Sequence, residues 1–145
     1  MNDLRLAGWG CLGLMGLALC LGCGYSPDLP PLAKVTGTVT LDGKPLTRGS
    51  VQFVPDESKG ITGPPSVGAI GPDGTYTMTT AGVSGAIVGW HKVAVEAPQE
   101  VDLSQGSWAP SLIPEKYNNP NASGLTAEVK AGQSNVVDLA LSSRP

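Results

Sequence analysis

Alternating hydrophobic and polar positions run through the chain from residue 35 onward. Val35–Leu41 sets valines, a glycine and a leucine on one face and three threonines on the other. Alternation of period two with β-branched residues predicts a strand that is buried on one side. The pair Asp42-Gly43 follows and favours a tight turn, because glycine tolerates positive φ and aspartate bonds its own backbone. The pattern therefore predicts an opening hairpin that continues through Lys44–Leu46 into a second strand, Ser50–Val54.

Five further segments repeat the alternation. Turn sequences separate them, and the last two segments are predicted to form a hairpin around residues 131–133. The segments are Ser66–Ile70, Thr75–Thr80, Trp90–Ala97, Leu125–Val129 and Asn135–Leu141. Seven strands at these spacings are typical of a β-sandwich. No helix of ordinary length is predicted, and the one candidate is a single turn near Pro114–Tyr117.

The longest irregular stretch runs from Pro98 to Gly124 and carries two aromatic residues, Trp108 and Tyr117. A loop of this length in a small domain is either functional or packed over a sheet edge. An exposed aromatic pair would suit stacking on a sugar or docking of a partner, whereas a buried pair would simply cover the sandwich. Both interpretations remain open from the sequence.

The first 23 residues form a targeting segment rather than part of the sandwich. A short start with one positive side chain, Arg5, precedes an almost unbroken apolar run, Leu6–Leu21. This length lies between the hydrophobic region of a signal peptide and a membrane span. The glycine content and the Cys-Leu-Gly-Cys ending favour the signal peptide. We expect a signal helix over 1–23, a proline-rich flexible tether over 24–33, the sandwich over 34–142 and a tail over 143–145.

The end of the leader resembles the bacterial lipobox, in which a small residue precedes a cysteine that is lipidated on sulfur. Cys23 follows Gly22 and fits this pattern, although Cys20 stands where a leucine is usual. Cys20 is the alternative acceptor, but Leu19 precedes it where a small residue is needed. A plain signal peptide and an uncleaved anchor are the remaining alternatives. Lipidation, by palmitate and further acyl chains, would anchor the protein firmly to a membrane.

Composition narrows the class of partner. The three cysteines, Cys11, Cys20 and Cys23, all lie in the leader, so we expect no disulfide in the sandwich. The net charge is −3 and the nine lysines and arginines are scattered, which disfavours nucleic acid. High glycine and proline counts, 20 and 13, agree with an all-β domain of short strands.

Three segments resemble the carboxypeptidase regulatory-like, or transthyretin-like, domain. They are Val35–Leu46, Val51–Pro55 and Gly71–Tyr76, with Gly85–Val95 similar to its next signature. Ile113–Asn118 and Ser123–Val129 are similar to the C-terminal part of small bacterial lipoproteins that carry this domain. The resemblance covers nearly all of 34–142 and implies a seven-stranded, prealbumin-like (Ig-like) sandwich. Its motifs are turn and core residues, so Gly37 and Asp42-Gly43 are interpreted as fold-specifying.

Candidate chemistry is sparse. His91 is the one histidine, and a single imidazole assembles neither a metal site nor a catalytic pair by itself. The hydroxyisourate-hydrolysing branch of the transthyretin-like fold implies several His and Arg residues and a Tyr-Arg-Gly-Ser ending, which this chain lacks. Asp56–Lys59 is a polar loop cluster, and Asp73 is a turn residue. We therefore expect no enzymatic activity, no metal and no cofactor.

These observations predict a lipid-anchored protein of the bacterial cell envelope, facing the periplasm or the cell surface. Its β-sandwich would have a structural or protein-interaction role, with the membrane as one partner and an envelope protein as another. The alternative is a module that binds a glycan or small ligand through the 98–124 loop, with Trp108 and Tyr117 as contacts.

Overall fold

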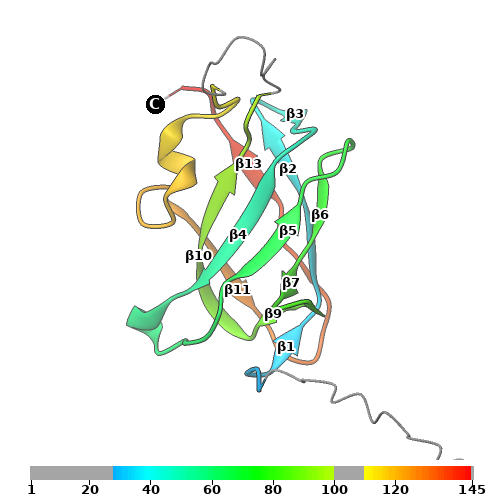
Figure 1. The fold of residues 1–145 in the computed structure, drawn as a ribbon, viewed down its shortest axis with the longest axis vertical. Coiled ribbons are helices and arrows are strands. Elements are labelled where there is room, and N and C mark those ends of the chain that lie inside the picture. Colours follow the sequence, from blue (N-terminus) through cyan, green and yellow to red (C-terminus); the bar gives the residue numbers. More distant parts are fainter. Residues whose placement is uncertain (1–27, 100–109, 145) are drawn as a thin grey trace, which may run out of the picture.

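The computed structural model describes residues 28–99 and 110–144, and these form an all-β domain. Figure 1 shows its two main sheets as layers, with β1 at one end of the molecule and the C-terminus at the other. The strands are β1 Leu32–Ala33, β2 Val35–Leu41, β3 Lys44–Pro45, β4 Ser50–Pro55, β5 Ser66–Ala69, β6 Thr75–Thr77, β7 Thr79–Thr80, β8 Val83–Ser84, β9 Ala86–Ile87, β10 Gly89–Glu96, β11 Leu125–Val129, β12 Asn135–Val136 and β13 Leu139–Leu141. The described residues also include two 3-10 helices, η1 Glu57–Lys59 and η3 Glu115–Asn118. None of the helices in the described residues is long and apolar enough to cross a membrane.

The larger sheet has six strands in the order β11-β10-β4-β5-β7-β8, and every neighbouring pair is antiparallel. The second sheet is built around β2. On one side of β2 lie β12 and β13, which are parallel to it, and on the other lie β3 and β6, which are antiparallel. The segment from residue 75 to 80 joins the two sheets, because β6 pairs with β2 whereas β7 pairs with β5.

The core lies between these two sheets, and the predicted alternation accounts for it. Val35 and Val39 of β2 are fully buried, as are Val51 and Phe53 of β4. Tyr76 and Met78 face the same core, as do the inward residues of β10, β11 and β13, namely Val93, Val95, Ala127, Val129, Leu139 and Leu141. The prediction of an all-β, sandwich-like fold is therefore confirmed at this level.

The opening hairpin is shorter than the pattern predicts. Asp42 and Gly43 both have positive φ, 51° and 81°, as a tight hairpin turn requires. Only β3 pairs back onto β2, however, and β4 lies in the other sheet. Gly49 lies between β3 and β4, and its φ of 118°, which glycine adopts readily, allows the chain to cross from the second sheet to pair with β10.

The predicted C-terminal hairpin is wrong. β11 pairs with β10, whereas β12 and β13 pair with β2, so the turn at 131–134 connects the two sheets instead of two neighbouring strands. The strands predicted at Thr75–Thr80 and Asn135–Leu141 are each divided in two, and additional short strands raise the number above seven.

The predicted tether also ends earlier than residue 33. Leu32 and Ala33 form β1, which is antiparallel to β9, and Ala33 is buried. Residues 24–27 of the tether and the whole predicted signal helix lie outside the described residues. The predicted turn near residue 115 is present as η3, which packs against β10.

Candidate functional site

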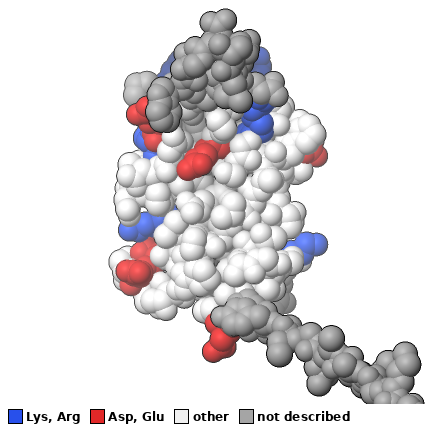
Figure 2. All heavy atoms as spheres, in the orientation of Figure 1, with Lys and Arg blue, Asp and Glu red and all other residues white. Residues whose placement is uncertain are grey.

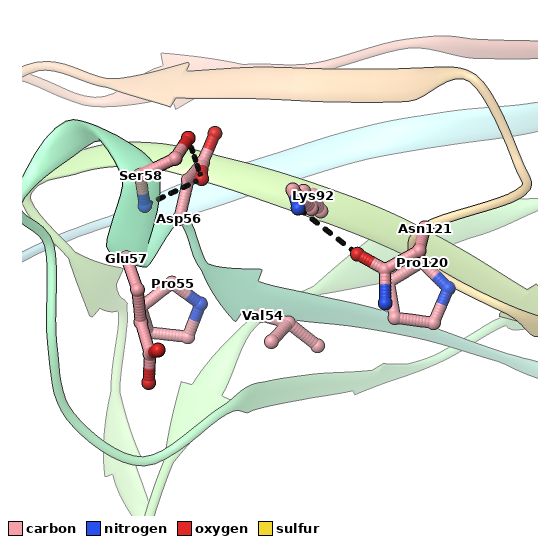
Figure 3. Close-up of a pocket in the computed structure, with 8 residues that line it drawn as sticks. All are labelled: Val54, Pro55, Asp56, Glu57, Ser58, Lys92, Pro120 and Asn121. Carbon is pink, nitrogen blue, oxygen red and sulfur yellow. Dashed lines mark hydrogen bonds between the residues drawn. The ribbon is translucent and has the colours of Figure 1, made fainter.

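A polar cavity of about 370 Å³ opens on the outer face of the larger sheet. Three elements form it: the end of β4 with η1, the middle of β10, and the loop that follows η3. Its lining consists of Val54, Pro55, Asp56, Glu57, Ser58, Lys92, Pro120 and Asn121 (Figure 3). Sites for small ligands have volumes of about 300–1,000 Å³, so the cavity lies at the lower end of that range.

One side of the cavity is a bond between a lysine and an amide. Lys92 points outward from β10, because its neighbours His91 and Val93 point into the core. Its Nζ donates to Oδ1 of Asn121 at 2.9 Å, and Figure 3 shows the two side chains meeting across the opening. The Asn121 backbone N–H donates to Oδ1 of Asn119 at 2.9 Å, so the backbone that carries the Asn121 side chain is fixed within its own loop.

The loop itself is fixed to the sheet by a buried serine. Ser123 Oγ donates to the carbonyl of Val93 on β10 at 2.5 Å and accepts from the backbone N–H of Leu125 at 3.1 Å. Ser123 is 7% exposed, so these bonds are shielded from water. The amide face of the cavity is therefore anchored before any ligand arrives.

The opposite side of the cavity is the turn at the end of β4. Asp56 is the N-cap of η1, and its Oδ1 accepts from Ser58 at 3.1 Å from the backbone N–H and 2.6 Å from the hydroxyl. The Ser58 hydroxyl bond lowers the pKa of Asp56; partial burial opposes this, and the charges of Lys92 and Lys59 add to the lowering. The cavity thus carries an ionised carboxylate at neutral pH, with Lys92 facing it.

An exposed tryptophan flanks the cavity. Trp90 lies two residues before Lys92 on β10 and points to the same outer face, where it is 38% exposed. The Nζ of Lys59 lies 5.0 Å from the centroid of its ring. The backbone N–H of Asp56 donates to the Trp90 carbonyl at 2.9 Å, which ties the start of η1 to β10. The helix η1 contributes to both places, because Lys59 lies over the indole while Glu57 and Ser58 line the cavity.

Tyr117, predicted as a ligand contact, is a core residue. It is 6% exposed, and its hydroxyl accepts from the backbone N–H of Ser142 at 3.1 Å. The turn of η3 directs the ring inward, because the apolar ring packs against the sandwich while Glu115 and Lys116 of the same turn remain exposed. Trp108, its predicted companion, lies outside the described residues, as do Cys20 and Cys23.

His91 is also part of the core. It is fully buried and its ring lies 5.6 Å from that of Phe53, centroid to centroid. Nδ1 lies 3.1 Å from the carbonyl of Gly89, while Nε2 has no partner. Burial lowers the pKa of His91, and the bond to Gly89 opposes this. The described residues contain no group of three or more His, Cys, Asp or Glu side chains arranged to hold a metal.

Asp73 has the turn role that the sequence indicates. Its Oδ1 accepts from the Thr75 backbone N–H at 3.1 Å and from the Thr75 hydroxyl at 2.7 Å. The Thr75 hydroxyl bond lowers the pKa of Asp73. The Asp73 carboxylate therefore stabilises the turn through its hydrogen bonds to Thr75.

Sequence reasoning missed the combination of Trp90, Lys92 and Asn121. The alternation in β10 already sets Trp90 and Lys92 on the outward face, so part of the signal was present. The position of Asn121 depends on how the loop after η3 returns to β10, and local sequence does not specify that path.

Fold and site together define an all-β domain with a small polar cavity and an exposed indole on one sheet face. No family model matches the chain, and no curated protein matches it. Among solved structures, a DUF3823 family protein from Parabacteroides merdae is similar, with a TM-score of 0.41 and 15% sequence identity. The match covers 79% of this chain and 46% of that protein, so this chain spans about half its length. A likeness this distant assigns no activity to this chain.

Proposed function

We propose that this chain is a non-catalytic, lipid-anchored protein of the bacterial cell envelope. In this proposal Cys23 is the lipidated residue, and the domain serves as a structural or protein-interaction module. The domain would belong with the carboxypeptidase regulatory-like, prealbumin-like sandwiches that the turn and core motifs resemble. The motifs at Asp42-Gly43 and Gly71–Gly74 form turns in the fold, which agrees with that assignment.

The observation that carries the proposal is the position of the first described strand. β1 enters at one end of the domain, and the chain ends at the opposite end (Figure 1). A lipid attached upstream of β1 would therefore hold the domain by one end and leave the outer sheet face and the far end free for a partner. His91 supports a non-catalytic role, because this imidazole is buried in the core.

Metabolic labelling with palmitate tests the anchor. We expect label in the wild-type chain and in Cys20→Ser, and no label in Cys23→Ser. Label that survives Cys23→Ser, or that is absent from the wild type, would contradict the proposal.

The interaction role is tested separately by cross-linking in intact envelopes. We expect a discrete cross-linked species for the wild type. Its amount should fall for Cys23→Ser, because a released domain is no longer concentrated at the membrane. A wild-type chain that cross-links to nothing would refute the interaction role while leaving the anchor unaffected.

A further inference from the structure

The outer face of the larger sheet carries an aromatic surface next to a cavity of hydrogen-bonding groups. Of the aromatic side chains that the structure describes, Trp90 alone is exposed, whereas Phe53, Tyr76 and Tyr117 are buried. An indole offers a flat apolar face for contacts and an N–H donor at its edge. Trp90 lies two residues before Lys92 on the same strand, β10, so the indole is next to the cavity.

The strand registers define what surrounds the indole. Trp90 lies opposite Glu128 of β11, and Lys92 lies opposite Thr126 of β11 and Val54 of β4. Residues two apart on a strand are separated by about 6.6 Å, so the indole and the Lys92 row are successive places on one surface. A ligand that spans both places must offer an apolar face to the first and polar groups to the second.

The polar groups of the cavity include both donors and acceptors. Lys92 offers an ammonium, Asn121 an amide and Ser58 a hydroxyl, while Asp56 accepts. The charges are mixed, with Lys92 close to the Asp56 carboxylate, and Figure 3 shows the Glu57 carboxylate pointing away from Lys92. Figure 2 shows no patch of a single sign over the described part of this face. An anionic ligand would therefore gain little here, whereas a neutral ligand rich in hydroxyls would find partners for both its donors and its acceptors.

We infer that this surface binds a short neutral oligosaccharide, with one sugar ring against the indole of Trp90 and the next in the Lys92–Asn121 cavity. A sugar ring has an apolar C–H face that packs on an indole and a rim of hydroxyls that donate and accept hydrogen bonds. Lys59 is exposed, and its long side chain can move from the ring and donate to a sugar hydroxyl. The site goes beyond the proposed interaction role and does not depend on the lipid anchor.

The inference is tested with the full chain in a detergent that has no sugar headgroup. The probes are the tetramers of N-acetylglucosamine, of β-linked glucose and of α-linked glucose. Titration calorimetry measures binding, and the indole N–H resonance of Trp90, identified by its loss in Trp90→Phe, reports the location. We expect at least one tetramer to bind saturably and to shift that resonance.

The variants locate the site on the surface. Trp90→Ala and Lys92→Met should each weaken binding by at least about tenfold. Trp90→Phe, which keeps an aromatic face, should weaken binding less than Trp90→Ala. Val136→Ala changes an exposed residue, 71% exposed, on the other sheet and should bind as the wild type does. Thermal unfolding of each variant checks that it is folded. If Trp90→Ala is not folded, the binding measured for Lys92→Met and Trp90→Phe decides whether the site is at this surface.

Two outcomes would overturn the inference. The first is that none of the three tetramers binds at millimolar concentration. The second is that binding is unchanged in the folded Trp90 and Lys92 variants. If a photo-cross-linker at position 90 captures a protein in envelopes while no tetramer binds, the surface belongs to a protein partner and the sugar assignment is wrong.

Discussion

Gly37 lies in the middle of β2, where the carbonyl of Val137 passes directly over it. A Cβ at this position would lie 1.8 Å from that carbonyl oxygen and 2.8 Å from the Tyr76 hydroxyl. The Tyr76 hydroxyl donates to the same carbonyl at 2.5 Å. Burial raises the pKa of Tyr76, so the hydroxyl remains a donor at any physiological pH. The glycine therefore makes room for a bond that ties β6 to the segment between β12 and β13.

Gly37→Ala should destabilise the domain by about 1–3 kcal/mol, because the added methyl group overlaps backbone atoms that cannot move freely. Tyr76→Phe should cost about 1–3 kcal/mol, since it leaves the Val137 carbonyl without its donor. Thr36→Ala, on the outward face of the same strand, is the control and should cost less than about 1 kcal/mol. Urea unfolding measures all three; a Gly37→Ala cost no larger than that of Thr36→Ala would contradict the steric argument.

The buried imidazole of His91 makes stability depend on pH. A carbonyl only accepts, so the Nδ1 facing Gly89 carries the proton, and Nε2 is an acceptor without a partner. Burial lowers the pKa of His91 in the folded state below the unfolded value of about 6.5. The unfolded state therefore binds more protons below about pH 6.5, and stability falls as the pH drops through this range.

Urea unfolding at about pH 7.5 and about pH 5 should accordingly show a lower free energy of unfolding at the acidic value. His91→Met, which fills the space without a titrating group, should reduce this difference. The pKa values of Asp42, Asp56 and Asp73 are also lowered, but these carboxylates lose their contribution to stability only below about pH 4. They therefore do not account for a difference between about pH 7.5 and about pH 5. An equal loss in wild type and His91→Met would show that another group is responsible.

At the scale of elements, Asn135 explains why the last strands do not form a hairpin. It is 7% exposed, and its Oδ1 accepts from the Lys130 backbone N–H at 2.9 Å. Its Nδ2 donates to the carbonyls of Lys34, Lys130 and Gln133 at 3.1–3.3 Å. One amide thus holds the turn at 131–134 against the start of β2, which directs β12 into the second sheet.

Asn135→Ala should cost about 1–3 kcal/mol, because it leaves buried backbone groups unpaired. Asn135→Asp should cost at least as much at neutral pH, since a carboxylate cannot donate and would face three carbonyl oxygens. Ser134→Ala, exposed in the same turn, should change stability by less than about 0.5 kcal/mol. Denaturant unfolding of the three variants checks the order; an aspartate milder than alanine would refute the donor role of Nδ2.

The same scale shows what the sequence could predict. The alternation located the strands and their inward residues, including Val39, Phe53 and Val95, because side-chain period is a local property. The pairing of the strands was harder to predict from the sequence. β12 and β13 are parallel to β2, and this pairing joins segments about a hundred residues apart with no connecting turn that a local sequence pattern would reveal. The same limit hid the cavity, since Asn121 reaches Lys92 only through the fold of the intervening chain.

At the scale of the whole molecule, the strand that precedes β2 closes one end of the core. β1 pairs with β9, the Val88 backbone N–H donates to the carbonyl of Pro31 at 2.9 Å, and both residues of β9, Ala86 and Ile87, are buried. The end of the predicted tether therefore forms part of the folded domain, through the pairing of Leu32 and Ala33 with β9.

A chain that starts at Lys34 should be less stable than one that starts at Asp28, by about 1–3 kcal/mol, because it loses this pairing and uncovers Ala86 and Ile87. The midpoint of thermal unfolding should fall by about 4–8 °C for each kcal/mol lost. Differential scanning calorimetry on the two chains measures the difference. Equal midpoints would mean that β1 adds nothing to stability.

The pairing of β1 with β9 also determines how the domain would respond to force. A pull on the N-terminal segment reaches the bond between Pro31 and Val88 first, and then Leu32 and Ala33, which are the whole of the strand pair. They would detach before β2, which is held on both sides by four other strands. The detached residues would lengthen the connection, and Ala33 would leave the core while the pairings of β2 stayed intact. The short strand would thus be the first part of the domain to yield to a load applied on its N-terminal side.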